Sequence, residues 1–284
     1  INKLEIARTA FNPVSGLPIL PGSSLKGAMR TAVVEAMRQQ TGRRYPITDQ
    51  EAGRNNDAAR KAKDMERDVL GGGFQTDPLR LVKVADAPFR PGKVRNMRTG
   101  EETPKLARSI LFQANRKKRP NQFAACGNIE TLVECIPAGQ HRAFHGQLTI
   151  EYKAGPNEQT PMHQIDWPLL AKACNDFYRA HFERELAMLE KNGYVSAIWA
   201  GNARKRLAPD GPWGKTIAAG HGFLLRVGRH SGAENVTVDA PRKIKIMKGR
   251  EQPVDWDMEA TTVWLAANEP GAGRDMHPFG WVFV

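Results

Sequence analysis

A turn-rich segment that leads directly into one regular helix constrains the fold of this chain most. Residues 13–22 contain three prolines and two glycines, which interrupt regular structure. Residues 23–42 then place apolar side chains at helical spacing. Ser23 and Ser24 are expected N-caps, and Gly42 is the expected stop. A helix is therefore predicted over 23–42, with its start held against a tight turn.

The rest of the chain mixes strand and helix patterns. Strands are expected over 79–85, 129–136, 147–152, 223–227, 236–238, 262–267 and 281–284, with a further one ending within residues 1–8. Helices are expected over 57–70 and from Asp166 to about Asn192. With the first strand inferred, the order is strand, helix, strand, strand, helix, strand. It predicts one α+β domain over 1–284, ferredoxin-like or RNA-recognition-motif-like, with insertions and a C-terminal extension.

The charge is strongly basic. Lys and Arg number 42 against 30 acids, which gives a net charge of +12, and such a surplus favours a polyanionic partner. Ten basic residues and two acids lie within 90–119. We expect a basic insertion over about 90–125, with the core formed by 1–89 and 126–284. The insertion is either a solvated loop or an arm that orders on RNA.

The cysteines and the hydropathy pattern indicate a compartment. Three cysteines without a CxxC pair are poor material for a disulfide framework, so a reducing cytoplasm is expected. No run of about 18 apolar residues is present, so no membrane span is expected.

Four stretches carry a resemblance to a known family. They are Leu17–Arg30 (LPILPGSSLKGAMR), Asp77–Asp86 (DPLRLVKVAD), Arg226–Glu234 (RVGRHSGAE) and Pro278–Val282 (PFGWV). The first stretch resembles the signature of the RAMP superfamily of CRISPR proteins. Together the four resemble the subunit that caps the 3′ end of the guide RNA in the type III-A Csm complex. The resemblance implies a prokaryotic cytoplasmic protein that binds guide RNA (crRNA), and possible partners are target RNA, neighbouring backbone RAMP subunits and host nucleases that trim the guide.

Two segments are the predicted RNA contacts. At the helix start, backbone N–H groups and the positive helix end suit phosphate, Lys26 and Arg30 add charge one turn apart, and Gly27 permits close approach. The residues expected there are Gly22, Ser23, Ser24, Lys26, Gly27 and Arg30. The second segment is a glycine-bracketed loop, and it comprises Gly228, Arg229, His230, Ser231 and Gly232. The simpler alternatives are an ordinary capped helix and a tight turn between strands.

Two basic clusters are further candidates for RNA or partner contacts. They comprise Arg116, Lys117, Lys118 and Arg119, and Arg204, Lys205, Arg206 and Lys215. The segment 211–216 imitates the end of a P-loop, but Pro209 replaces the required first glycine, so nucleotide binding is rejected. Cys126, Cys135, His141 and His145 lack the short Cys pair of a zinc finger, so neither a metal nor a cofactor is expected.

Catalysis is not expected. The resemblance implies that backbone subunits of type III complexes cleave target RNA with an Asp in the loop before the Pro-Gly-Ser-Ser turn. An ungapped alignment places Asn12 there, and an amide can be neither a base nor an anionic ligand. One alternative is a metal-independent guide-processing ribonuclease using His230, His141 or His145. Others are a backbone RAMP subunit and a structural end cap held by protein contacts alone.

Overall fold

The structure is a computed structural model, and it describes residues 6–54, 57–95, 99–119, 131–152, 155, 158–239, 242–246 and 254–284. The α-helices are α1 Gly22–Thr41, α2 Asp49–Gly53, α3 Asp57–Val69, α4 Trp167–Lys191, α5 Ala197–Leu207 and α6 Pro212–Ala218. Three 3₁₀ turns are η1 Phe74–Thr76, η2 Pro78–Leu81 and η3 Ala233–Asn235. The strands are β1 Ile19–Leu20, β2 Val82–Val84, β3 Ala87–Pro88, β4 Lys93–Arg95, β5 Glu102–Pro104, β6 Ser109–Lys117, β7 Thr131–Cys135, β8 Leu148–Ile150, β9 Leu224–Arg226, β10 Ile244–Ile246, β11 Asp255–Asp257, β12 Thr262–Ala267, β13 His277–Pro278 and β14 Trp281–Phe283.

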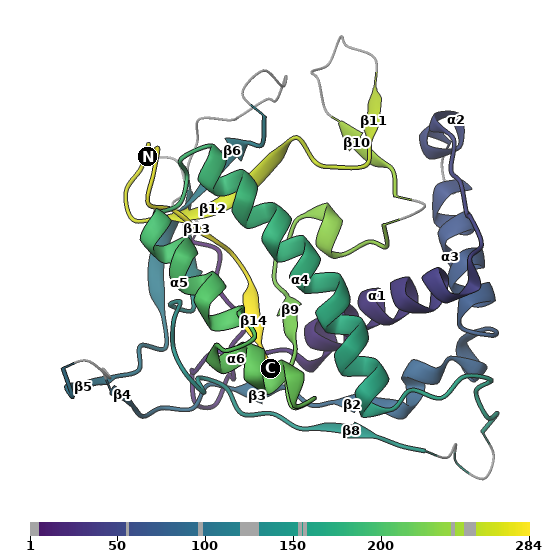
Figure 1. The fold of residues 1–284 in the computed structure, drawn as a ribbon, viewed down its shortest axis with the longest axis horizontal. Helices are drawn as coiled ribbons and strands as arrows, with labels where there is room; N and C mark the ends of the chain where they lie inside the picture. Colours follow the sequence, from purple (N-terminus) through teal and green to yellow (C-terminus); the bar gives the residue numbers. More distant parts are fainter. Residues whose placement is uncertain are drawn as a thin grey trace.

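Helices α1 and α4 form the centre of the core. Asp166 begins α4, because its side chain accepts a hydrogen bond from the Leu169 amide at 2.8 Å. Both helices bury apolar residues along most of their length, and Figure 1 shows α4 crossing α1. Gly42 ends α1 in the left-handed conformation, as the sequence predicts.

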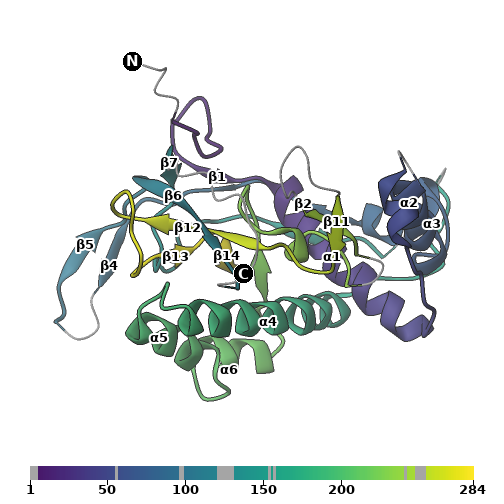
Figure 2. The ribbon, with the colours of Figure 1, turned by 90° about the horizontal axis from the view of Figure 1, so that it is seen from above.

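The largest sheet is antiparallel, with the strand order β13-β12-β6-β7. Successive side chains of a strand point to opposite faces. Ala114 of β6 and Leu265 of β12 are paired and fully buried, so this face packs on the core. Helices α4, α5 and α6 lie together on one side of this sheet (Figure 2).

The expected basic insertion over 90–125 is wrong for residues 109–117. These residues form β6, which pairs with β12 on one side and β7 on the other. The basic residues Arg116 and Lys117 come only at the end of β6, whereas Ile110, Leu111, Phe112 and Ala114 before them are apolar and Ala114 is fully buried. The charge at the strand end misled the prediction. Within the described part of the expected insertion, the hairpin of β4 and β5 is the segment that projects from the body (Figures 1 and 2). Residues 120–125 lie outside the described part.

Other elements divide into confirmed and corrected predictions. Helices 57–70 and 166–192, and strands 223–227, 262–267 and 281–284, are confirmed within a few residues. The expected strand 79–85 begins instead as a 3₁₀ turn, since the Asp77 side chain caps Leu79 and Pro78 follows it. The expected strands 129–136 and 147–152 exist, but β7 pairs with β6 and β8 pairs with β2. Residues 236–238 form no strand, and α2, α5 and α6 were not predicted.

The chain is therefore a mixed helix and strand protein, as predicted. The ferredoxin-like detail remains a prediction. One feature agrees with it, because Ala7 forms a parallel bridge to Val133 of β7, as a first strand beside the third would. The described sheet departs from it, because β12 lies beside β6 at the position of an added strand.

Candidate nucleic-acid interface

The start of α1 is held by a distant carboxylate. The helix begins at Gly22 after Pro21, so Ser23 and Ser24 lie in its first turn rather than at the cap, which corrects the prediction. The Gly22 amide donates to Oδ1 of Asp86 at 2.7 Å, and the Ser24 amide donates to the Pro21 carbonyl. One first-turn donor is thus taken by an acid, while both serine side chains are exposed.

Gly22 is required at this place by close packing. A Cβ there would lie 2.3 Å from the carbonyl oxygen of Val84, which is backbone and cannot give way. The approach is set by the pairing of β1 with β3, which places Leu20 opposite Ala87. Gly27 is different, since it is exposed and a Cβ there would meet no atom within 4 Å. The open surface over Gly27 leaves room for a ligand to approach α1.

Lys26 is the cation that remains available at the start of α1. Its ammonium has no carboxylate partner among the described residues. Burial lowers the pKa of Lys26, and the positive charge of Lys83 lowers it further. A phosphate at this position would relieve the repulsion between the two lysines.

Arg30 has a structural role. Its guanidinium contacts Glu66 of α3 at 2.7 Å and Asp77 at 2.5 Å. Burial opposes the charge, but the hydrogen bonds to Glu66 and Asp77 outweigh it, so the pKa of Arg30 is raised. The predicted pair of phosphate-binding cations is thus divided, because Arg30 is neutralised by acids and Lys26 is not.

The family-like stretches Arg226–Glu234 and Pro278–Val282 lie side by side and form one structural unit. Strand β9 pairs with β14, and the Val227 amide donates to the Gly280 carbonyl at 2.9 Å. The guanidinium of Arg226 is fully buried, contacts Glu185 of α4 at 2.5 Å and lies 4.7 Å from the Trp281 ring. This buried pair anchors the base of the glycine-bracketed loop.

Only part of the loop over 228–232 faces outward. Gly228, Arg229 and Gly232 are exposed, and both glycines have positive φ, which favours glycine. Ser231 is buried, and its hydroxyl donates to the Gly228 carbonyl at 2.6 Å. His230 is half-buried and contacts aromatic rings. Ser231 therefore shapes the turn rather than contacting RNA, which corrects the prediction, and Arg229 is the exposed cation of the loop.

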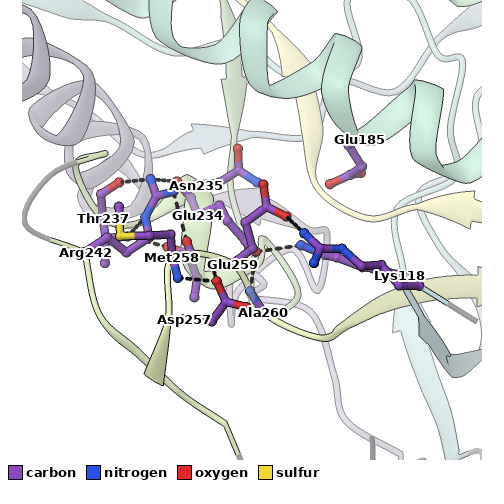
Figure 3. Close-up of polar contacts among 12 residues, drawn as sticks. Lys118, Glu185, Glu234, Asn235, Thr237, Arg242, Asp257, Met258, Glu259 and Ala260 are labelled. Carbon is purple, nitrogen blue, oxygen red and sulfur yellow. Dashed lines mark hydrogen bonds and ion pairs between the residues drawn. The ribbon is translucent and has the colours of Figure 1, made fainter. Parts of the chain in front are cut away.

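A polar network fixes the segment that follows the loop (Figure 3). Glu234 accepts from Lys118 at 2.5 Å and from the Ala260 amide at 2.6 Å. Burial opposes its charge, but Lys118 outweighs it and the pKa of Glu234 is lowered. Arg242 donates to the carbonyls of Glu234 and Thr237, both at 3.0 Å. These contacts tie the loop to the end of β6 and the start of β12.

Tyr178 of α4 connects the start of α1 with the segment that follows the glycine-bracketed loop. Its hydroxyl is 3.0 Å from the carbonyl oxygen of Ala28 in α1 and 3.1 Å from that of Asn235 after the loop. It is fully buried, and burial raises its pKa. Through α4, the start of α1 and the glycine-bracketed loop belong to the same rigid core.

Most of the other predicted cations are engaged within the protein. Lys118 and Arg119 pair with Glu234 and Glu259, and Arg204 pairs with Glu183 and Glu190. Arg116 donates to the carbonyls of Asn115 and Ala272, and Arg206 lies over the Trp213 ring. Among the described residues, Lys117, Lys205 and Lys215 have no acidic partner.

The residues considered for catalysis are dispersed. Oδ1 of Asn12 accepts from the amides of Val14 and Ser15 at 2.9 and 3.1 Å, so its amide closes a turn. His141 and His145 are exposed. Within the described residues no group of three His, Cys, Asp or Glu side chains is arranged for a metal ion. Cys126, considered as a zinc ligand, lies outside the described part.

The structure is that of a mixed helix and strand protein with a cation beside a glycine in each of two segments: half-buried Lys26 beside Gly27, and exposed Arg229 beside Gly228. The chain belongs to the RAMP superfamily, whose family model matches residues 4–201. Its fold is similar to a chain in the cryo-electron microscopy structure of a Csm–crRNA–target RNA ternary complex of a type III-A CRISPR–Cas system. That match has 18% identity and a TM-score of 0.51, and covers 96% of this chain and 74% of the other.

A crystal structure of Csm5 from T. onnurineus also matches, with 18% identity and a TM-score of 0.47, over 81% of this chain and 66% of that one. No curated protein sequence matches the chain. No helix in the described part is both long and apolar enough to cross a membrane.

Proposed function

We propose that this protein is a guide-RNA-binding subunit of a type III-A CRISPR effector complex, positioned at the 3′ end of the guide. The observation that carries the proposal is the surface at the start of α1, where Ser23, Ser24 and Gly27 are exposed and Lys26 is half-buried beside them. It lies within the family-like stretch, where a helix start, a free cation and an open glycine suit a phosphate. The superfamily match and the fold likeness to a chain of an RNA-bound complex support it.

The mode of binding follows from the guide, whose sequence varies. Phosphate contacts by Lys26 and Arg229 hold a ribonucleotide chain without reading its bases. Neighbouring RAMP subunits and target RNA are the other proposed partners. We also propose that the fold is an elaborated ferredoxin-like domain, with β12 added to the sheet.

The direct experiment measures binding of single-stranded RNA to the purified chain at rising salt. Lys26→Ala combined with Arg229→Ala should weaken binding by about tenfold or more and reduce the salt slope by about 1.4, because two phosphate contacts to a single strand are lost. Lys191→Ala, which removes an exposed cation at the end of α4, is the matched control. Unchanged affinity and slope in the double variant would refute the proposal.

The position in the complex needs a separate measurement. In a reconstituted complex, a photoreactive nucleotide at the 3′ end of the guide should crosslink to this chain. A crosslink only to internal guide positions would assign it a backbone position instead.

We also propose that the chain is not a nuclease. Asn12 lies at the position where the resemblance implies a catalytic Asp, and its side chain closes a turn. RNA incubated with the wild-type chain, with and without divalent metal, should remain intact. Asn12→Asp introduces the carboxylate that the resemblance implies for cleavage. The carboxylate can accept hydrogen bonds from the same two amides, so the variant keeps the turn. Cleavage by the wild-type chain would overturn the proposal.

A further inference from the structure

The sheet β13-β12-β6-β7 has a second face that the main core does not use. Val263 and Leu265 of β12 point into the core, so Trp264 between them points to the other face. Trp264 pairs with Asn115 of β6, whose side chain therefore lies on the same face. By the same alternation, Gln113 and Lys117 lie on this face on either side of Asn115.

Three aromatic rings from separate segments meet there. The ring of His230 lies 5.2 Å from Trp264 and 5.0 Å from Phe279, tilted by 32° and 42°. All three residues are half-buried, and none is among the fully buried core residues. The glycine-bracketed loop thus delivers an aromatic ring to the sheet face while its Arg229 stays in solvent.

Polar atoms beside these rings have no partner. Oε1 of Gln113, Oδ1 of Asn115 and Nε2 of His230 are shielded from solvent and make no hydrogen bond within the described part of the chain. Such groups are rare in folded proteins and call for an explanation. The amide nitrogen of Gln113 donates to Thr131, so the unpartnered atoms of the two amides are their oxygens. Amide oxygens accept hydrogen bonds, which the amino and imino groups of a nucleobase edge can donate.

The border of the face is positive. Arg229 precedes His230, and Lys117 follows Asn115 by two residues on the same face of β6. Neither cation has an acidic partner among the residues that the structure describes. A phosphate backbone is therefore the chemistry that complements this border, and aromatic rings beside it suit unstacked bases.

We propose that Trp264, His230 and Phe279, with Asn115 and Gln113 beside them, form a stacking platform for an unpaired base of single-stranded RNA. This inference rests on the proposed RNA-binding function and extends it, because phosphate contacts alone would not distinguish a base from its absence. The platform is sequence-tolerant, since every base offers a ring face to stack on.

The test compares two labelled oligonucleotides of equal length by fluorescence anisotropy, one of uridine nucleotides and one containing abasic sites. They carry the same phosphate charge, so the platform predicts that the abasic chain binds about tenfold more weakly. Trp264→Leu should reduce binding of the uridine chain to about the abasic level and leave the salt slope unchanged. Trp213→Leu is the matched control, because Trp213 is also half-buried and stacks on one ring, Phe283, at 5.1 Å.

The possible outcomes separate the stacking platform from the proposed RNA-binding function. Equal, salt-dependent binding of both oligonucleotides would overturn the platform and leave the proposed function standing. If neither oligonucleotide binds, both the platform and the proposed function are wrong. If Trp264→Leu changes only the affinity for purified neighbouring subunits, the face binds protein and the platform is wrong. Should Trp264→Leu fail to fold, Phe279→Leu and a 4-thiouridine crosslink to the wild-type chain decide, and a crosslink that misses Trp264 and Phe279 counts against the platform.

Discussion

The amide of Gly22 and the carboxylate of Asp86 lie 2.7 Å apart, although 64 residues separate them in the sequence. An acid at a helix start stabilises the helix through its dipole and satisfies an N–H group. The same negative charge repels phosphate at the place where the proposed function requires it. Stability and RNA affinity are therefore opposed at this residue.

Asp86→Asn should separate these two effects. The amide oxygen can still accept from Gly22, so stability should change little, while RNA affinity should rise roughly threefold as a like charge is removed. Asp86→Ala, which removes the acceptor, should lower the free energy of unfolding by about 1 kcal/mol. Urea unfolding and RNA titration of both variants measure the two quantities. A fall in the RNA affinity of Asp86→Asn would contradict the assignment.

Lys26 and Arg30 should respond differently to substitution, although they are one helical turn apart. Lys26→Ala should reduce the salt slope of binding to single-stranded RNA by about 0.7 and leave stability nearly unchanged. Arg30→Ala leaves Asp77 and Glu66 without their partner, so it should cost about 2 kcal/mol of stability with a smaller effect on the slope. Equal effects of the two variants on the slope would show that Arg30 also contacts RNA.

Gly22 and Gly27 offer a matched pair of alanine substitutions. Gly22→Ala forces a Cβ against the Val84 carbonyl oxygen and should destabilise the protein by about 3 kcal/mol. Gly27→Ala meets no atom, so it should stabilise α1 by up to about 1 kcal/mol while weakening RNA binding if RNA approaches the helix there. Thermal unfolding and RNA titration check both. An unaltered RNA affinity in a folded Gly27→Ala protein would show that nothing approaches the helix closely at Gly27.

Local patterns explain what the sequence could predict. The apolar spacing over 23–42 and the cap at Asp166 are properties of neighbouring residues, so α1 and α4 were predicted closely. The extent of the projecting arm is mispredicted because the four basic residues 116–119 close and follow β6, and their charge masks the apolar residues before them. Strand β6 is recognisable as a central strand only from its partners β7 and β12, which no local pattern reveals.

The sequence predicts which residues belong to the candidate site, but it does not predict which partners they contact in the fold. Lys26 and Arg30 are alike in the sequence, and only the fold brings Glu66 and Asp77 to one of them. His230 and Ser231 follow Arg229 directly, yet the turn directs one to Trp264 and the other to the Gly228 carbonyl. Trp264 carried no signal as a site residue, because a single aromatic in a strand usually belongs to a core.

The buried ion pair of Arg226 and Glu185, at the base of the glycine-bracketed loop, should contribute strongly to stability. Arg226→Ala leaves a mostly buried carboxylate without its partner, at a cost of about 3–5 kcal/mol. Arg226→Met combined with Glu185→Leu removes both charges and should recover much of that loss. Urea unfolding of the single and double variants measures the coupling. Equal stability of these two proteins would show that the pair contributes little beyond packing.

His230 should make stability fall as the pH drops below the ordinary pKa of histidine. Burial lowers its pKa, and Arg229 and Arg226 lower it further, whereas the unfolded chain keeps the ordinary value of about 6.5. Below about pH 6.5 the unfolded state thus binds a proton that the folded state does not, so stability is complete above that pH and falls with acidification. Burial also lowers the pKa of His277, which therefore acts with the same sign. Asp239, with a pKa of about 2, contributes only at more acidic pH.

His230→Phe keeps an aromatic ring between Trp264 and Phe279. In this variant the midpoint of urea unfolding should depend less steeply on pH than in the wild-type protein, although some dependence should remain. Parallel curves for the two proteins would show that His230 does not carry the dependence.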